Sequence, residues 1–325
     1  MDGTAPRQPR FVEAPVRAGA AGGGDERAAI AAGLQREPAV VAPKYFYDRL
    51  GSQLFAAITE LDEYYPTRTE GAIFAAHGPA IGAAVGRGAT LVDLGAGDCA
   101  KAMRLMPLFA PARYVAVDIS VEFLRDALAE VQRRFPALEV TGVGTDFSAA
   151  LELPADATAG RPAFLYPGSS IGNFTPDEAL AFLRRVHARA AGGGLLIGVD
   201  LVKPVAVLEA AYDDALGVTA AFNLNLLRHL NRRLGADFDV RQWRHAARYD
   251  RARSRIEMHL EARSAVVVRW PGGERRFAAG ERIHTENSYK YDPDDFAALL
   301  RDAGFAAPRR WSDAQGWFAL YWAEA

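Results

Sequence analysis

The sequence predicts an α/β protein with a Rossmann-like core and a second lobe. Short apolar runs alternate with amphipathic helical patterns from about residue 85 to about residue 202, which is typical of a parallel sheet covered by helices on both faces. A glycine-rich loop directly follows the first of these runs, as in folds that bind nucleotides at the ends of their strands. The alternation stops near Lys203 and resumes near Asp292, so we expect the residues between them to belong to the second lobe.

Five apolar runs are the expected strands of the core. Each run is short and bounded by turn-forming residues, which favours a buried strand. A last strand is expected near the C-terminus, at about Trp317–Trp322. The five runs are Ala89–Leu94, Tyr114–Asp118, Leu138–Val143, Ala163–Tyr166 and Leu195–Leu201.

Two helices between these strands carry recognisable start signals. The first spans Val121–Phe135, where apolar residues recur at helical spacing after a candidate cap at Ser120. The second begins after Thr175, which forms a capping box with Glu178 and is followed by Pro176 at the first helical position. Helices in these places are expected to cover the parallel sheet.

The second lobe is expected to combine helices with a β-hairpin. Val207–Leu234 shows helical patterns, whereas Arg255–Trp270 and Arg275–Phe277 flank the turn signal Pro271-Gly272-Gly273. The first residues of the chain are rich in Ala, Gly, Pro and Arg, which favours a flexible tail with at most one short helix, starting near Asp25. The expected organisation is a tail at 1–34, a core at 85–202 plus 291–325, and a substrate-binding lobe at 35–84 plus 203–290.

Composition and charge argue against several classes of partner. The chain has 325 residues, half of them hydrophobic, which is enough for a full core and a second lobe. Its formal net charge is −2, so nucleic acid is not the expected partner. No apolar run reaches the length of a membrane span, and the chain does not begin with a secretory signal. We therefore expect a cytoplasmic monomer that binds a small molecule.

The cysteine and histidine content argues against a disulfide or a metal site. Cys99 is the one cysteine, so no disulfide can form within the chain. Because no basic partner is evident, Cys99 is expected to be a packing residue and not a nucleophile. The six histidines form no HExxH motif or comparable cluster, and we expect no bound metal.

A glycine loop and two acidic residues at strand ends predict a nucleoside-containing cofactor. Gly95 and Gly97 follow the first expected strand, where glycine allows a tight turn and the close approach of a ligand to the backbone. Asp118 ends the second strand, where a carboxylate accepts hydrogen bonds from ribose hydroxyls. Asp146 follows the third strand. Each carboxylate alone is also explained by a surface or capping role, but their order along the chain favours a cofactor site.

The loop suits S-adenosylmethionine better than a dinucleotide. A pyrophosphate binds at a helix N-terminus, and Asp98 in the loop is an unfavourable neighbour for two phosphates. S-adenosylmethionine carries a sulfonium, an ammonium and a carboxylate, but no phosphate. Lys101 would then face the carboxylate, although an exposed helix lysine explains this residue equally well. The sequence therefore predicts S-adenosylmethionine as the cofactor.

Motifs along most of the chain resemble those of the bacterial histidine Nα-methyltransferase family. The resemblance runs from about Pro43 to near the C-terminus, and its motifs occur in order at compatible spacing. They are Tyr45-Phe46-Tyr47-Asp48, EYYPTRTE from Glu63 to Glu70, GSSIGN from Gly168 to Asn173, DLVK from Asp200 to Lys203, AYDDA from Ala211 to Ala215, GVTA from Gly217 to Ala220, RIEM from Arg255 to Met258 and TENS from Thr285 to Ser288.

The resemblance implies a class I methyltransferase core and an enzyme that transfers three methyl groups to the α-amine of histidine. The product would be hercynine, in the biosynthesis of ergothioneine. Tyr47 and Asn173 are the implied catalytic residues. The implied cofactor contacts are Gly95, Lys101, Asp118, Asp146 and Phe147. The implied substrate contacts are Tyr64, Gly168, Asn173, Tyr212, Thr219, Met258, Glu286 and Ser288.

The residue types suit these roles and leave other functions open. Glu286 can accept an imidazole N–H, and Ser288 can serve the second ring nitrogen. Asn287 lies between them, where the family pattern has an apolar residue, and the glycine loop contains Asp98 and Cys99 where a Ser/Thr-rich version is expected. Another aromatic amino acid or a histidine derivative is an alternative substrate. A non-catalytic cofactor-binding protein and an NAD-dependent oxidoreductase are alternatives from other classes.

Overall fold

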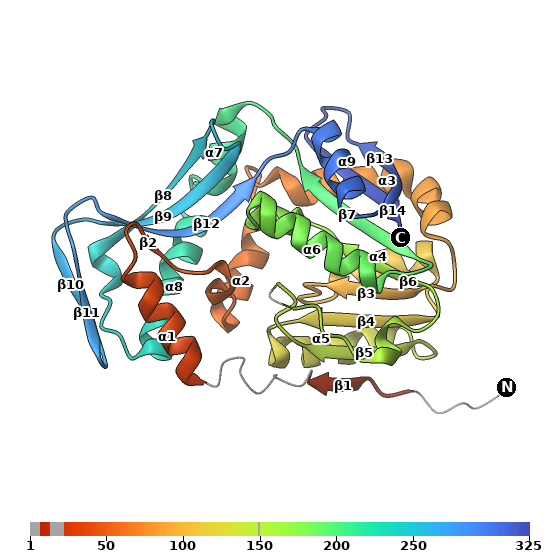
Figure 1. The fold of residues 1–325 in the computed structure, drawn as a ribbon, viewed down its shortest axis with the longest axis horizontal. Coiled ribbons are helices and arrows are strands. Elements are labelled where there is room, and N and C mark those ends of the chain that lie inside the picture. Colours follow the sequence, from red (N-terminus) through yellow and green to blue (C-terminus); the bar gives the residue numbers. More distant parts are fainter. Residues whose placement is uncertain (1–6, 14–22, 149) are drawn as a thin grey trace. The chain divides into compact units, whose positions relative to one another are not determined.

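The protein consists of two compact units, each built from separate stretches of the chain (Figure 1). The computed structural model describes residues 7–13, 23–148 and 150–325. The first unit contains residues 68–201 and 291–325 together with the described residues near the N-terminus. The second contains residues 202–290 together with the described residues up to Thr67.

The first unit is built on an eight-stranded sheet with the order β1-β5-β4-β3-β6-β7-β14-β13. The strands from β1 to β7 run parallel, whereas β14 pairs antiparallel with both β7 and β13. All five expected core strands and the expected C-terminal strand are present, which confirms the predicted α/β fold. The strands are β1 (Arg10–Glu13), β3 (Thr90–Leu94), β4 (Arg113–Asp118), β5 (Glu139–Gly144), β6 (Pro162–Tyr166), β7 (Gly194–Asp200), β13 (Ala306–Ser312) and β14 (Phe318–Glu324).

Helices cover both faces of this sheet because successive strand residues point to opposite sides. In β3, Val92 and Leu94 pack in one apolar cluster, and Leu91 packs in the other. The first cluster includes α6 and α9, and the second includes α3, α4 and α5. The helices are α3 (Tyr65–Val85), α4 (Ala100–Phe109), α5 (Val121–Arg134), α6 (Pro176–Arg189) and α9 (Pro293–Asp302).

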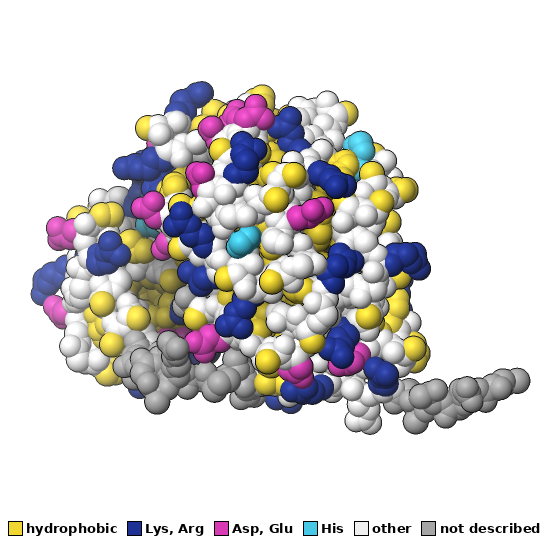
Figure 2. Space-filling model, turned by 45° about the vertical axis from the view of Figure 1, so that its right-hand side comes forward, with side chains coloured by type: hydrophobic (Ala, Val, Ile, Leu, Met, Phe, Trp, Pro, Cys, Tyr) yellow, Lys and Arg dark blue, Asp and Glu magenta, His cyan; other side chains and the backbone are white. Residues whose placement is uncertain are grey.

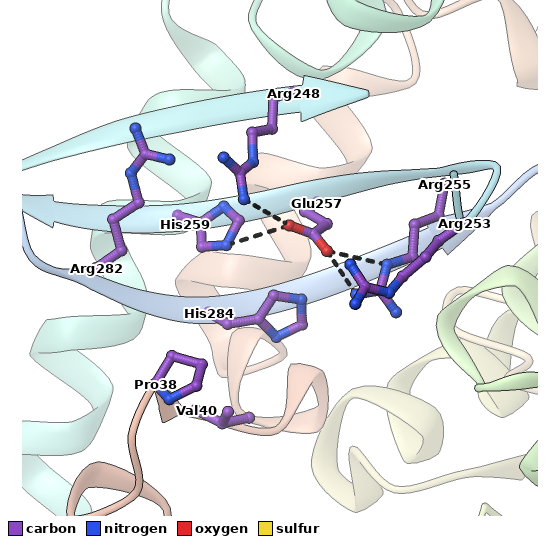
Figure 3. Close-up of a pocket in the computed structure, with 9 residues that line it drawn as sticks. All are labelled: Pro38, Val40, Arg248, Arg253, Arg255, Glu257, His259, Arg282 and His284. Atoms are coloured by element: carbon purple, nitrogen blue, oxygen red, sulfur yellow. Dashed lines mark hydrogen bonds and ion pairs between the residues drawn. The ribbon is translucent and has the colours of Figure 1, made fainter. Parts of the chain in front are cut away.

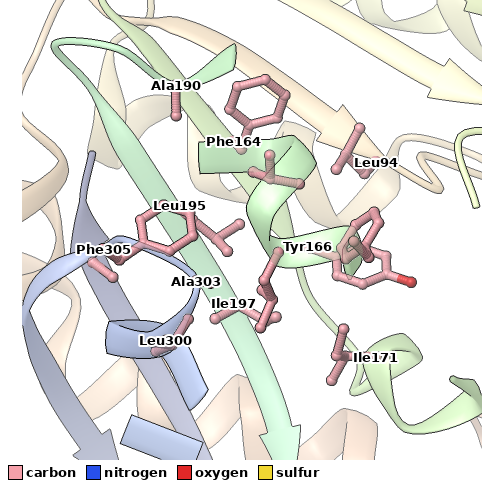
Figure 4. Close-up of a cluster of buried hydrophobic side chains, with 14 of the residues drawn as sticks. Leu94, Phe164, Tyr166, Ile171, Ala190, Leu195, Ile197, Leu300, Ala303 and Phe305 are labelled. Carbon is pink, nitrogen blue, oxygen red and sulfur yellow. The ribbon is translucent and has the colours of Figure 1, made fainter. Parts of the chain in front are cut away.

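The core beneath α6 and α9 holds β6 and β7 in place (Figure 4). Phe164, Tyr166 and Ile197 are almost fully buried there, together with Leu300 and Phe305 from the C-terminal segment. Burying such a side chain contributes about 1.5–3 kcal/mol. The packing therefore fixes the strand ends from which the loops of the site emerge.

The start of α6 confirms the predicted capping box. Glu178 N–H donates to Thr175 Oγ1 at 3.4 Å, and Thr175 N–H donates to Glu178 Oε2 at 2.8 Å. The prediction for Ser120 is correct in its position but not in its hydrogen bond. Ser120 occupies the N-cap position of α5, but its side chain forms no capping bond. Its N–H instead donates to Asp118 Oδ1 at 2.8 Å.

The second unit contains a four-stranded sheet with the order β2-β12-β9-β8 and a separate β10–β11 hairpin. The hairpin closes around Gly272 and confirms the predicted turn. The expected helical stretch divides at Gly217, which has a φ of +75°, into α7 and α8. The elements are α1 (Gly23–Leu34), β2 (Ala39–Val40), η1 (Pro43–Phe46), α2 (Arg49–Ile58), α7 (Val205–Tyr212), α8 (Val218–Leu234), β8 (Trp243–Asp250), β9 (Arg255–Ala262), β10 (Val266–Trp270), β11 (Gly273–Phe277) and β12 (Arg282–Tyr289).

The four-stranded sheet has an apolar face and a polar face. Ile256, Met258 and Leu260 of β9 are buried, and the latter two pack in the core that α8 shares. Glu257 and His259, which alternate with them along the strand, belong to the polar face. This alternation determines which side chains of β9 and β12 lie on the same face of the sheet.

Two expected boundaries differ from the structure. The stretch 1–34 was expected to be a flexible tail with one short helix near Asp25; that helix is present as α1, but the pairing of β1 in parallel with β5 was not expected. Residues 1–6 and 14–22 of that tail lie outside the described residues. Residues 68–84 were expected in the substrate-binding lobe, but they belong to the first unit because α3 packs against its sheet.

The described surface mixes both signs of charge. In the view of Figure 2, Lys and Arg side chains alternate with Asp and Glu and form no broad area of one sign on the coloured part of that face. This distribution agrees with the formal net charge of −2. Among the described helices, none combines the length and apolar character needed to cross a membrane.

The capping box of α6 gives a direct test of the fold. Thr175→Ala removes both the hydroxyl and its bond to the helix N-terminus, and we expect it to lower the free energy of unfolding by about 1 kcal/mol. Thr175→Ser keeps the hydroxyl and should retain most of that stability. Urea denaturation of the three proteins measures the difference. Equal stability of the alanine variant and the wild type would show that the cap contributes nothing.

Candidate active site

The predicted cofactor residues of the first unit follow the carboxyl ends of adjacent parallel strands. Gly95 and Asp146 follow β3 and β5, Asp118 ends β4, and the loop after β6 carries Asn173, which was predicted to bind the substrate. The chain continues from β3 to β4 and β5 on one side of the sheet, and β6 then pairs on the other side of β3. Ligands in open α/β sheets bind at such a point, where the strand order reverses.

The glycine loop is held by Asp118. Gly95 and Gly97 have φ angles of +73° and +54°, in the left-handed region that favours glycine. Gly97 N–H donates to Asp118 Oδ2 at 2.9 Å. A Cβ atom on Gly95 would lie 3.7 Å from the Phe147 ring. The structure therefore brings the predicted cofactor residues Gly95, Asp118 and Phe147 together around one loop.

Glu70 joins two further predicted residues and was not predicted itself. Its carboxylate forms an ion pair with Lys101 and accepts the Gly168 N–H at 2.8 Å. Glu70 is almost fully buried, at 1% exposure, and a buried carboxylate needs such partners. Lys101 is thus a partner of a buried carboxylate, and not the freely exposed helix lysine of the alternative interpretation. The only sequence signal for Glu70 is its place in the EYYPTRTE motif.

Asp146 and Asn173 occupy the two flanking loops. Asp146 Oδ1 accepts the N–H of Ser148 at 3.1 Å, which shapes the turn that presents Phe147. The Phe147 ring packs against Tyr166, with their centroids 5.9 Å apart. Asn173 ends a short 3-10 helix, is half-buried, and forms no hydrogen bond with the described residues. Its amide is therefore available to a ligand.

A buried polar pair lies next to the glycine loop. Tyr114 donates to Asp93 Oδ2 at 2.9 Å, and burial raises the pKa of Asp93 to about 7. Cys99 is buried in the apolar cluster that also contains Tyr114, and burial raises the pKa of its thiol to about 12. Cys99 is thus a neutral packing thiol, as expected. Asp93 was not predicted, because its partner Tyr114 is on the next strand.

In the second unit, β12 brings two predicted substrate residues to one face of the sheet. Glu286 pairs with Met258 of β9 in the strand register, and Ser288 pairs with Ile256. Tyr212, at the end of α7, donates its hydroxyl to Ser288 Oγ at 2.6 Å. His245 of β8 holds the end of α7 through the Tyr212 carbonyl, at 2.8 Å. Four predicted contacts therefore come from three neighbouring elements.

The carboxylate of Glu286 can accept a hydrogen bond that no described residue donates. It is 8% exposed and forms no hydrogen bond with the described residues. Burial raises its pKa to about 8, and the Lys290 charge opposes this shift. A buried carboxylate without donors is unfavourable unless a ligand supplies one. The site is thus suited to a ring that carries an N–H.

The remaining predicted residues of this unit lie around an aromatic cluster. Tyr47 meets Phe55 and Phe222 edge to face, at 5.8 and 5.9 Å between ring centroids. Tyr64 also contacts Phe55, at 6.3 Å. Thr219, on the first turn of α8, is buried, and its N–H donates to Asp214 at 2.7 Å. Tyr47 and Tyr64 share a partner, but the structure gives no direct contact between either of them and Glu286.

Asn287 belongs to the opposite, polar face. It pairs with Glu257 in the register, and its Oδ1 lies 2.9 Å from His284 Nε2. Because strand residues alternate, a polar side chain here does not enter the face that carries Glu286 and Ser288. The departure from the family pattern at Asn287 therefore leaves the face that carries these two predicted substrate residues unchanged.

The polar face carries a groove of about 400 Å³ (Figure 3). Glu257 lies at its centre and accepts from Arg255 Nε at 3.0 Å and from Arg248 at 3.3 Å. His259 Nε2 lies 3.6 Å from Glu257, and burial lowers the pKa of His259 to about 4. None of the predicted site residues lines this groove, whose residues are Pro38, Val40, Arg248, Arg253, Arg255, Glu257, His259, Arg282 and His284. Among the described residues, no group of His, Cys, Asp and Glu is suited to hold a metal.

Comparison with known proteins decides the family. Residues 26–325 match the family described as histidine-specific, S-adenosylmethionine-dependent methyltransferases. The chain belongs to the histidine-specific methyltransferases. It is similar to the histidine N-alpha-methyltransferase of Mycolicibacterium smegmatis, with 41% identity over 90% of this chain and 92% of the relative. It is 40% identical to the protein of the same name from Mycobacterium tuberculosis, over the same shares of the two chains.

A more distant relative belongs to a longer protein. Ergothioneine biosynthesis protein 1 of Neurospora crassa is 31% identical over 82% of this chain, which corresponds to 31% of the relative. The methyltransferase family and the observed sheet together confirm the predicted class I methyltransferase fold and its cofactor, S-adenosylmethionine.

The residues of this methyltransferase fit that cofactor. Asp118 presents a carboxylate at a strand end, where ribose hydroxyls are bound in related folds. The glycine loop leaves the backbone open at Gly95, beside the Phe147 ring. Lys101 supplies a positive charge that its pairing with Glu70 keeps in place. These donors and acceptors match a ligand with hydroxyls, an aromatic base and a carboxylate.

Asp118 gives a test of the cofactor site. We expect Asp118→Ala to weaken the binding of S-adenosylhomocysteine by about 1–3 kcal/mol, because ribose hydroxyls and Gly97 both lose an acceptor. Asp118→Asn keeps an oxygen for Gly97 and should lose less. Calorimetry measures the affinities, and thermal denaturation checks that both variants are folded. Unchanged affinity in the alanine variant would exclude Asp118 from the site.

The polar face predicts a stability that falls in acid. In the unfolded chain, His259 has its usual pKa of 6.5 and binds a proton below that pH. In the folded protein its pKa is about 4, so it binds a proton only in stronger acid. The unfolded state therefore holds more protons between these values, and stability is lost as the pH falls from 6.5 to 4. The loss attributable to His259 is at most about 3 kcal/mol.

His259→Gln should reduce this acid sensitivity, since it removes the titrating ring. Urea denaturation at pH 7.5, 6 and 5 measures the effect, and His77→Gln in α3 is the control. A pH dependence in the His259 variant as steep as that of the wild type would contradict the assignment.

Proposed function

We propose that this protein transfers three methyl groups from S-adenosylmethionine to the α-amine of L-histidine, giving hercynine for ergothioneine biosynthesis. The observation that carries the proposal is Glu286, a buried carboxylate without a hydrogen-bond donor, on the same face as Ser288. The pair occurs in a member of the histidine-specific methyltransferases. Two relatives at about 40% identity are named histidine N-alpha-methyltransferase.

The ring-binding residues suit imidazole. A neutral imidazole has one N–H donor and one acceptor nitrogen. Glu286 offers an acceptor, and the Ser288 hydroxyl serves the second nitrogen. Met258 is paired with Glu286 in the register and supplies an apolar surface for the ring. Phenol and indole rings lack this combination of one donor and one acceptor nitrogen.

The amino-acid end is assigned to tyrosines and Asn173. Tyr64 and Tyr212 carry hydroxyls that can donate to the substrate carboxylate. The Asn173 amide, which has no hydrogen-bond partner among the described residues, can accept from the substrate amine. Tyr47 is assigned to the same amine, where it orients the group or passes its proton to water.

The reaction needs alignment more than a strong base. S-adenosylmethionine supplies the methyl group as part of a sulfonium, and a C–N bond forms as the C–S bond breaks. In well-oriented systems, holding the amine in line with the methyl carbon lowers the activation barrier by up to about 7–11 kcal/mol. A nearby positive charge also favours the neutral amine, because like charges repel. The protons released from the amine pass to water.

We propose that the protein acts as a monomer on a small molecule. The mixed surface charge in Figure 2 supports a small-molecule substrate in place of nucleic acid. We place the reaction in the cytoplasm, since the single cysteine suits a reducing compartment.

Mass spectrometry of the product tests the proposed function directly. With histidine and excess S-adenosylmethionine, we expect trimethylhistidine as the end product, and monomethyl and dimethyl forms as intermediates. A quaternary ammonium can no longer donate a hydrogen bond, which favours release at that stage. Accumulation of the monomethyl form alone, or turnover of another aromatic amino acid in place of histidine, would contradict the proposal.

Glu286 and Asn173 should differ in their effect on substrate choice. Glu286→Ala removes the acceptor for the ring, and we expect kcat/KM for histidine to fall by about one to two orders of magnitude. Cofactor affinity should stay nearly unchanged, and the preference for histidine over tryptophan and tyrosine should narrow. Asn173→Ala should impair every amino-acid substrate, because all share the amine. An equal loss for all three amino acids in the Glu286 variant would show that Glu286 does not select the ring.

A further inference from the structure

Lys290 is a buried lysine at the end of β12 that the sequence did not assign to the site. It is 3% exposed. Its Nζ donates to Ser288 Oγ at 2.7 Å and to the Tyr212 hydroxyl at 3.1 Å. It also lies 4.8 Å from the centre of the Tyr212 ring. A buried ammonium is costly unless it is paired, and here its partners are two proposed substrate contacts.

The hydrogen bonds around Lys290 fix the direction of the Ser288 hydroxyl. An ammonium can only donate, so Ser288 Oγ accepts from Lys290. Tyr212 also donates to Ser288 Oγ, at 2.6 Å. The Ser288 oxygen therefore accepts twice, and its own hydrogen is not used by any described residue. That hydrogen is left for a ligand, to which Ser288 must act as a donor.

The same lysine acts on Glu286 through its charge. Burial disfavours the ionised carboxylate of Glu286, and Lys290 is the described charge that favours it. Tyr212 and Ser288 are two polar groups packed beside Lys290. The positive charge therefore favours the ionised, accepting form of Glu286, while the hydrogen bond from Lys290 keeps Ser288 a donor.

We infer that Lys290 is a positioning residue that sets Ser288 as donor and favours the accepting form of Glu286, so that the pair selects a neutral imidazole with one N–H. The inference rests on the proposed function, because it assumes that these two residues bind the ring. An imidazolium carries two N–H groups and would direct one at the Ser288 donor. An indole has no acceptor nitrogen for Ser288. The arrangement thus excludes both rings.

The inference predicts a particular pH dependence of histidine binding. The KM for histidine should fall as the pH rises from 6, because both the imidazole and Glu286 lose their protons. In Lys290→Met, Glu286 loses its positive neighbour. We expect a KM for histidine roughly tenfold higher near neutral pH and a midpoint of the KM profile moved up by about one pH unit. The affinity for S-adenosylhomocysteine should not change.

Two further variants separate charge from orientation. Lys290→Gln keeps N–H donors for Ser288 and Tyr212 but has no charge, so it should shift the pH midpoint with a smaller rise in KM. Lys203→Met is the matched control. Lys203 is also buried, with its Nζ 3.0 Å from the Tyr65 hydroxyl and 4.4 Å from the ring centre. This control should leave the midpoint in place.

The decisive measurement repeats the pH profile in a Glu286→Gln background, where no carboxylate can titrate. There, adding Lys290→Met should no longer move the midpoint. The inference is overturned if Lys290→Met raises KM equally at every pH, or if its shift persists without the carboxylate. Failure of the proposed function looks different, because the wild-type protein would then not methylate histidine at all. Circular dichroism and thermal denaturation confirm that each variant is folded.

Discussion

A single buried carboxylate connects segments of the first unit that carry predicted site residues. Glu70 of α3 forms an ion pair with Lys101 of α4 and accepts the Gly168 N–H from the loop after β6. Removing such a group would leave a half-buried ammonium and a half-buried N–H without this partner. The glycine loop, the start of α4 and the GSSIGN loop therefore depend on one side chain for their common geometry. Asp118 adds a second connection, because it ends β4 and accepts a hydrogen bond from the glycine loop.

Much of the fold follows from local sequence, because apolar runs and capping residues act over a few positions. The five core strands, the hairpin turn and the Thr175 capping box are of this kind. The edges are different. Most residues of β13 are exposed or half-buried, so this strand lacks an apolar pattern and is defined by its pairing with β14. The same holds for β1. The boundary expected after residue 84 is wrong because most of α3 belongs to the first unit, and this membership depends on packing that helix-forming residues alone do not reveal.

The site shows a comparable division between what sequence reveals and what requires the fold. Gly95 and Asp118 are recognisable because their chemistry is tied to strand ends. Glu70, Asp93 and Lys290 are not, because each gains its role from partners that only the fold brings near, such as Tyr114 for Asp93. Asn287 shows the converse. Its position in the sequence places it between two predicted substrate contacts, yet the strand alternation directs it to the polar face.

The stretch 202–290 leaves and re-enters the first unit at neighbouring points. Leu201 and Tyr291 form a β-bridge, and Tyr291 N–H donates to the Asp200 carbonyl at 3.0 Å. A segment whose ends lie this close can be replaced by one of different length without deforming its host. These two junctions mark natural points for chimaeras in which one relative supplies the methyl-donor fold and another supplies the residues that recognise the acceptor. The same arrangement would let the stretch 202–290 change in length or sequence while the sheet of the first unit and its loops keep their geometry.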